Sequence, residues 1–102
     1  MQDLLTEKEL AALKKWSTPS IANAIEIFNI KPRSEGFMLP EIKCQFPKLG
    51  NMIGYAVTAV ITAASPDGRR VQPPDYWAEI QKIPAPRIVV IHDLDRPVLG
   101  SF

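Results

Sequence analysis

Three side chains that could bind a metal ion or a polar ligand lie close together near the end of the sequence: His92, Asp93 and Asp95. They follow the apolar run 87–91, and ligands of open α/β sheets bind beyond the carboxyl ends of strands. However, a metal site needs three or four ligands that converge from separate elements, and neighbouring loop residues rarely all point inward. The structural alternative is that Asp93 or Asp95 caps the next helix or accepts hydrogen bonds from loop amides.

A second candidate for ligand binding is the pair Arg69 and Arg70, which follows the turn sequence SPDG at 65–68. Two adjacent guanidinium groups could bind a phosphate or a carboxylate through paired hydrogen bonds. The alternative is that both arginines are solvated loop residues, as charged side chains beside a turn commonly are.

Nucleophilic and nucleotide-dependent chemistry finds little support in the sequence. The single cysteine, Cys44, has no second cysteine for a metal or redox pair, so we interpret it as a small buried hydrophobic residue. The glycines form neither a dinucleotide-binding fingerprint nor a phosphate-binding loop, which disfavours nucleotide cofactors. No G-x-S-x-G motif is present to support a serine nucleophile.

Charge and composition favour neutral partners and a reducing compartment. Twelve basic and eleven acidic residues leave a formal charge of +1, which gives no reason to expect nucleic acid or an anionic membrane as partner. One cysteine cannot form an internal disulfide. The first residues do not resemble a secretory signal, and no apolar run approaches the roughly 20 residues that span a bilayer. We therefore expect a cytoplasmic protein.

Two helices are predicted in the region 6–29. Thr6 and Glu9 have the spacing of a capping box, which predicts a helix over about 7–16 with a buried stripe of Leu10, Leu13 and Trp16. Thr18 followed by proline predicts a second start, because proline suits the first turn of a helix. This helix should run to about Asn29, with its buried face formed by Ile21, Ala24, Ile25 and Phe28.

An α/β core is predicted to begin after an irregular, proline-containing connection over 31–49. Residues 51–64 are rich in β-branched residues and apolar on both alternating sets, which predicts a strand covered on both faces. Pro73-Pro74-Asp75 should open a short helix that ends near Lys82. The run 87–91 then has the pattern of a parallel strand reached by a crossover. We expect packing contacts from four aromatic residues, either in the core or at an interface: Trp16, Tyr55, Tyr76 and Trp77.

The sequence predicts one α/β domain over 1–102 that is incomplete in this chain. A strand covered on both faces needs neighbouring strands and helices on both sides, whereas only two strands and three short helices are expected here. The remainder of the sheet must come from a continuation of the chain, from another subunit, or from both.

Three stretches in this order resemble the N-terminal half of the RraA-like family, which includes 4-hydroxy-4-methyl-2-oxoglutarate aldolase and a regulator of ribonuclease activity. They are STPSIANA at 17–24, IGYAVTA at 53–59 and RIVVI at 87–91. The Gly-x-Ala-x-Thr pattern that starts at Gly54 is the most specific part. One departure is Asn23, where relatives often carry aspartate.

The resemblance implies that the N-terminal helices precede part of a layered β/β/α swivelling-type domain. It also implies a pyruvate-forming carbon–carbon lyase, of the aldolase or oxaloacetate decarboxylase type, in which Mg²⁺ or Mn²⁺ polarises a small 2-oxo acid. Members assemble as trimers or hexamers. Relatives hold the substrate carboxylate on a Gly-Glu loop and bind substrate and metal with an Arg-Asp pair. Gly100, Ser101 and Phe102 resemble the approach to that loop, and the Arg-Asp pair would lie beyond Phe102.

Two expectations follow from this placement. The 102-residue chain should lack catalytic residues of its own, should hold no metal alone and should be inactive, while the longer protein acts on 2-oxo acids. The alternative is a non-catalytic regulator that binds a ribonuclease or another protein, as the other named branch of the family does.

Overall fold

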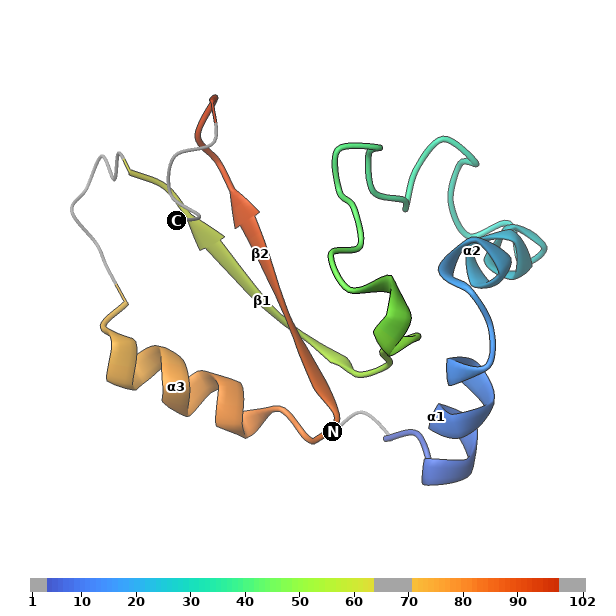
Figure 1. The fold of residues 1–102 in the computed structure, drawn as a ribbon, viewed down its shortest axis with the longest axis horizontal. Helices are drawn as coiled ribbons and strands as arrows, with labels where there is room; N and C mark the ends of the chain where they lie inside the picture. Colours follow the sequence, from blue (N-terminus) through green and yellow to red (C-terminus); the bar gives the residue numbers. More distant parts are fainter. Residues whose placement is uncertain (1–3, 64–70, 98–102) are drawn as a thin grey trace. The chain divides into compact units, whose positions relative to one another are not determined.

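The computed structural model describes residues 4–63 and 71–97, and it contains three α-helices and a two-stranded parallel sheet. In chain order the elements are α1 (Glu7–Lys14), α2 (Thr18–Glu26), a short 3-10 helix (Pro47–Leu49), β1 (Tyr55–Ile61), α3 (Pro73–Lys82) and β2 (Arg87–Asp93) (Figure 1). The chain divides into two units, Met1–Met52 and Ile53–Phe102, and each is described by itself. The mixed α/β class predicted from the sequence is confirmed.

The predicted capping box opens α1. The Glu9 amide donates to Thr6 Oγ1 at 3.2 Å, and the Glu9 carboxylate accepts from the Thr6 amide at 2.7 Å and from the Thr6 hydroxyl at 2.9 Å. These bonds satisfy donors that the first turn leaves without an intrahelical partner. The helix ends at Lys14, before the predicted Trp16, whose side chain is 63% exposed. Leu10 and Leu13 are half-buried, as expected for the stripe.

The capping box predicts a pH dependence of α1. The hydrogen bond from the Thr6 amide, and then the one from its hydroxyl, lower the pKa of Glu9 below the ordinary value of 4.5. Because the folded pKa is the lower one, the stabilisation is present above the unfolded pKa and is lost as pH falls through the folded pKa. We expect Cα chemical shifts of residues 7–14 to lose helical character over that range. Glu9→Gln should flatten the dependence, and an unchanged titration in this variant would contradict the assignment.

The second helix begins one residue earlier than the sequence suggested. Ser17 is the N-cap, since its hydroxyl accepts from the Ser20 amide at 3.3 Å, so Thr18 is the first helical residue and Pro19 the second. After Glu26 the backbone forms i→i−3 hydrogen bonds, as in a 3-10 turn, and Asn29 adopts a left-handed backbone conformation with φ 52°. Asparagine tolerates this conformation, which explains why the turn ends where the helix was predicted to end.

Asn51 fastens the irregular connection to the end of α1. Its Nδ2 donates to the carbonyls of Lys14 and Trp16, both at 3.2 Å. The Lys14 carbonyl belongs to the last turn of α1, where carbonyls lack intrahelical donors, and the Trp16 carbonyl lies two residues past the helix. The connection 31–50 itself is exposed throughout, and its one regular element is the 3-10 helix Pro47–Leu49.

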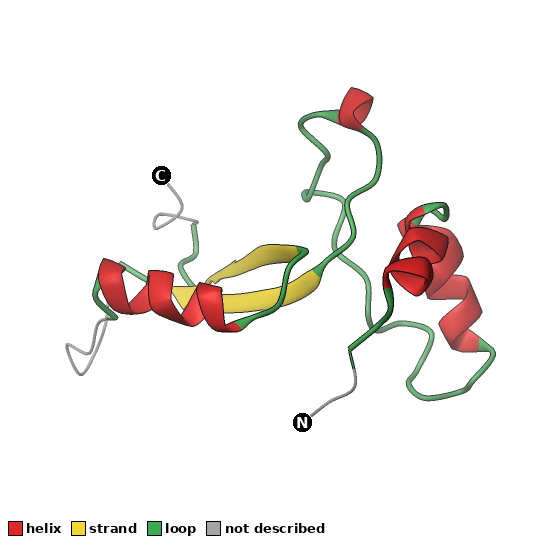
Figure 2. Ribbon diagram, turned by 90° about the horizontal axis from the view of Figure 1, so that it is seen from below, coloured by secondary structure: helices red, strands yellow, loops and turns green. Residues whose placement is uncertain are grey.

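The predicted crossover is confirmed in the second unit. Strands β1 and β2 pair in parallel from Tyr55 opposite Arg87 to Ile61 opposite Asp93. Helix α3 links them on one side of the pair (Figures 1 and 2). The helix has the predicted bounds, Pro73–Lys82. Two prolines occupy its first turn, where the amide donors that proline lacks would have no intrahelical partner. Its half-buried residues are Tyr76 and Ile80, four positions apart, and the half-buried Ile83 is the C-cap residue that follows it.

Strand β1 is covered on one face in the part of the chain that the structure describes. Cover on both faces required elements from a continuation of the chain or from another subunit, so it stays a prediction. Tyr55, Val57, Ala59 and Ile61 alternate with three exposed residues. Val57, at 6% exposure, is the one buried residue among 4–63 and 71–97. Paired residues of parallel strands share a face. The other face carries the exposed Ala56, Thr58 and Val60 of β1 beside Ile88, Val90 and His92 of β2, of which Ile88 is half-buried and the other two are exposed.

Several residues expected in the core are exposed as well. Trp77 is 62% exposed and Phe28 is 73% exposed, whereas Tyr55 and Tyr76 are half-buried. Ala24 and Ile25, predicted on the buried face of α2, are also exposed, and Ile21 is half-buried. An apolar stripe indicates which side chains favour burial, but these side chains are buried only where a second helix or strand packs on them. Within each described unit, too few elements pack together to cover these stripes.

Candidate functional site

The carboxyl ends of β1 and β2 come together at one edge of the sheet, and Asp95 joins them. Its carboxylate accepts a hydrogen bond from Thr62 Oγ1 at 2.8 Å and another from the Ala63 amide at 2.7 Å. The Leu94 amide donates to the Ile61 carbonyl at 2.9 Å, which extends the ladder by one residue beyond the two strands. Of the three candidates predicted to lie past the strand, Asp95 does so, at the edge where ligands of parallel sheets bind, whereas His92 and Asp93 are the last two residues of β2.

The loop after β2 is held by its own hydrogen bonds. The Asp95 amide donates to Asp93 Oδ1 at 2.9 Å, and Arg96 Nη1 donates to the carbonyls of Asp93 and Asp95 at 3.0 and 2.8 Å. Both aspartates are half-buried and His92 is exposed. The structural alternative, in which Asp93 or Asp95 binds loop amides, is thus the arrangement that the structure shows.

The fit of a metal ion to this cluster is poor. Both carboxylate oxygens of Asp95 accept hydrogen bonds from the end of β1, and one oxygen of Asp93 accepts from the loop. Within residues 4–63 and 71–97, no group of three or more His, Cys, Asp or Glu side chains could hold a metal ion. These side chains therefore order the loop, and we derive no step of a reaction through a metal bound to them.

The other candidates lie in the first unit or outside the described residues. Arg69 and Arg70 fall in 64–70, and Gly100, Ser101 and Phe102 fall in 98–102, so all five lie outside the described residues. Cys44 is exposed, so its interpretation as a buried residue is wrong. It lies in the connection 31–50, which no helix or strand of its own unit covers.

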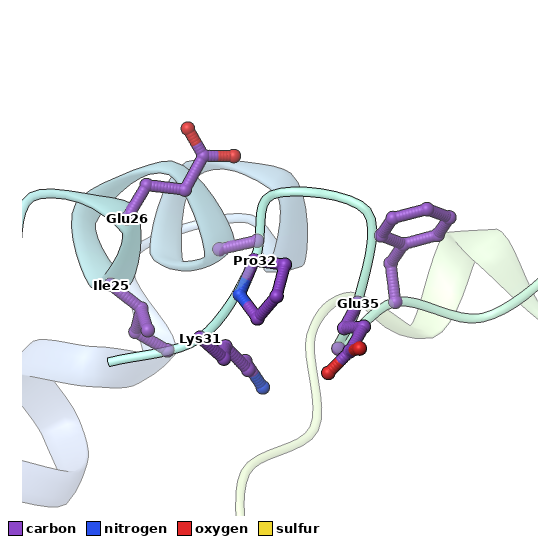
Figure 3. A pocket seen from close by; sticks show the side chains of 8 residues that line it. Ile25, Glu26, Lys31, Pro32 and Glu35 are labelled. Carbon is purple, nitrogen blue, oxygen red and sulfur yellow. The ribbon is translucent and has the colours of Figure 1, made fainter. Parts of the chain in front are cut away.

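A shallow depression in the first unit brings charged groups together. It is lined by Ala22, Ile25, Glu26, Lys31, Pro32, Glu35, Gly36 and Phe37. Lys31 and Glu35 extend to one side of it and Glu26 to the other (Figure 3). Glu26 forms an ion pair with Arg33 at 3.2 Å. The depression is open, most of its lining residues are exposed, and the ion pair is a surface contact of small energy.

Two partners of the strand-end cluster were not identified as candidates from the sequence. Thr62 and Ala63 follow β1 directly and bind Asp95 across more than thirty residues of chain. The sequence did contain a signal for this contact. Thr62 lies at the end of one predicted strand, and Asp95 lies just past the end of the next. Parallel pairing in register brings two such positions to the same edge.

Comparisons with known proteins do not place the chain in a family. No family model matches it. Neither the curated proteins nor the solved structures include a significant match to it. Within the described residues, no helix has the length and hydropathy needed to cross a membrane.

Proposed function

We propose that this chain is the N-terminal part of an RraA-like, divalent-metal-dependent lyase that forms pyruvate from small 2-oxo acids. The observation that carries the proposal is the pairing of two of the three resembling stretches. IGYAVTA at 53–59 enters β1 and RIVVI at 87–91 lies in β2, and the strands pair in parallel through a single crossover helix. The third stretch begins at Ser17, the N-cap of α2, and lies within that helix.

The glycine of the Gly-x-Ala-x-Thr pattern has a physical role that supports the proposal. A Cβ on Gly54 would lie 3.0 Å from the backbone carbon and oxygen of Pro86 and 3.1 Å from the backbone carbon of Arg87. The Tyr55 amide donates to the Pro86 carbonyl at 2.9 Å just beside it. Backbone atoms held by a strand ladder cannot move aside as a flexible side chain can, so glycine allows the two strands to begin this close together.

The uncovered sheet face supports the proposal that the domain is completed elsewhere. Parallel sheets are found almost only with both faces covered, and here one face of β1 is exposed along three positions. A layered swivelling-type domain, completed by later residues and assembled as a trimer or hexamer, would supply the missing cover. The exposure of Trp16 and Phe28 agrees with burial at a subunit interface.

The chemistry of the proposed full-length protein would depend on residues outside the described part. A bound Mg²⁺ or Mn²⁺ would act as a Lewis acid on the 2-oxo group. Gly100, Ser101 and Phe102 remain the proposed approach to the loop that holds the substrate carboxylate. The cytoplasm is the proposed compartment, and neither nucleic acid nor a membrane is a proposed partner, because the formal charge is +1.

The test is an assay of the full-length protein for pyruvate release from 4-carboxy-2-oxo acids. Turnover should require Mg²⁺ or Mn²⁺ and fall by at least about 100-fold when the metal is chelated, since Lewis-acid stabilisation contributes several kcal/mol. The 102-residue chain, assayed in parallel, should give no turnover. Absence of turnover above the metal-free control in the full-length protein would refute the proposal.

The near-neutral charge also permits a second candidate, a non-catalytic regulator that binds a ribonuclease or another protein. A full-length sequence without an Arg-Asp pair after the Gly-Glu loop would favour this candidate over the lyase. The two candidates are therefore separated by the residues that follow Phe102 before any assay is made.

A further inference from the structure

The Asp95 side chain joins the end of β1 to the segment that follows β2. Its two carboxylate oxygens are divided between Thr62 Oγ1 and the Ala63 amide, at 2.8 and 2.7 Å. The bond from the Ala63 amide is at the short end of the range for N–H···O bonds, and the bond from the Thr62 hydroxyl has the ordinary O–H···O length. Asp95 is half-buried, so water competes less for its oxygens than at a fully exposed site.

The backbone on either side of Asp95 is fixed in the same way. Its own amide donates to Asp93 Oδ1 at 2.9 Å, and its carbonyl accepts from Arg96 Nη1 at 2.8 Å. The Leu94 amide is bound to the Ile61 carbonyl at 2.9 Å. The carboxylate therefore does not reach across from a loose loop, because hydrogen bonds on both sides determine where it lies.

We propose that Asp95 is a positioning residue, which sets the separation of the two strand ends and the direction in which the chain leaves β2. The proposal rests on the proposed lyase function, in which the segment after β2 leads to the substrate. Both carboxylate oxygens are occupied by donors from the two residues that follow β1, so Asp95 acts through the backbone and does not bind substrate or metal. A displacement of about 1 Å at a site that orients a substrate can cost a factor of about 100 in rate.

Three variants distinguish the loss of the hydrogen bonds that position the strand ends from the mere loss of a carboxylate. Asp95→Ala removes both bonds. Asp95→Asn can keep both, because the amide oxygen accepts from Ala63 and the amide nitrogen can donate to the Thr62 hydroxyl, which also accepts. Asp75→Ala removes an exposed aspartate from the first turn of α3 and serves as the matched control.

Two measurements are needed. In the 102-residue chain, the amide proton of Ala63 should move upfield in Asp95→Ala and stay close to wild type in Asp95→Asn and Asp75→Ala. In the full-length protein, Asp95→Ala should lower kcat/KM by about 10- to 100-fold, mainly through kcat, while Asp95→Asn restores it and Asp75→Ala leaves it unchanged.

Each contrary outcome has a distinct meaning. An unchanged Ala63 resonance in Asp95→Ala would overturn the proposal whatever the enzyme does. A shifted resonance with an unchanged kcat/KM per folded molecule would reduce Asp95 to a structural residue and equally overturn it. A wild-type full-length protein without turnover would refute the lyase function, and with it the role in catalysis, while the Ala63 resonance would still decide whether Asp95 joins the strands.

Discussion

Val57→Asp is expected to separate β1 from β2. Val57 is 6% exposed and lies opposite Val89, the third of the seven residue pairs of the two strands. A carboxylate at this position would lose its hydration with no opposing charge, which costs several kcal/mol in a folded protein. A two-stranded sheet is marginally stable even without such a cost, so the pairing should not survive.

Val60→Asp is the matched control for this prediction. It places the same side chain on the same strand, but Val60 is 62% exposed on the uncovered face. The pairing should therefore persist in the 102-residue chain. Amide proton exchange of residues 55–61 and 87–93 measures both variants, with protection lost in Val57→Asp and retained in Val60→Asp. Equal loss of protection in the two variants would show that both faces of β1 are covered.

Local patterns predicted the elements well, because their causes are local. The capping box of Thr6 and Glu9 depends on residues three apart, and the two prolines that open α3 act within one turn. The parallel pairing of β1 with β2 was also predictable, since a strand, a helix and a second apolar strand have few other arrangements. The N-cap of α2 was misplaced by one residue because Ser17 and Thr18 are both good N-caps.

Burial and the strand-end cluster were less predictable, because both depend on partners distant in sequence. Apolar residues on both faces of β1 show that both faces favour burial, but the pattern does not say which element provides the cover. Cys44 was misplaced for the same reason, since a small apolar side chain in an irregular connection is buried only if another element packs on it. The two bonds of Asp95 to the end of β1 require the register of the sheet, which the sequence does not state.

The second large effect concerns the stability of the chain as a whole. Folding must offset roughly 1–2 kcal/mol of backbone entropy per ordered residue, mainly by burying apolar surface. Val57 is the one buried residue among 4–63 and 71–97, and its neighbours on the same face of β1 are half-buried. We therefore expect helices and strand pairing to form locally in the 102-residue chain, without the cooperative core that gives a single transition.

Differential scanning calorimetry of the purified 102-residue chain tests this account most directly. The uncovered sheet face predicts a broad transition with an enthalpy well below the roughly 0.7 kcal/mol per residue of a complete globular domain. The same chain should also bind a dye that is specific for exposed apolar surface. A monomer with one sharp transition of full enthalpy and no dye binding would show that the chain completes its own core, and would contradict the proposal that later residues or other subunits cover the sheet.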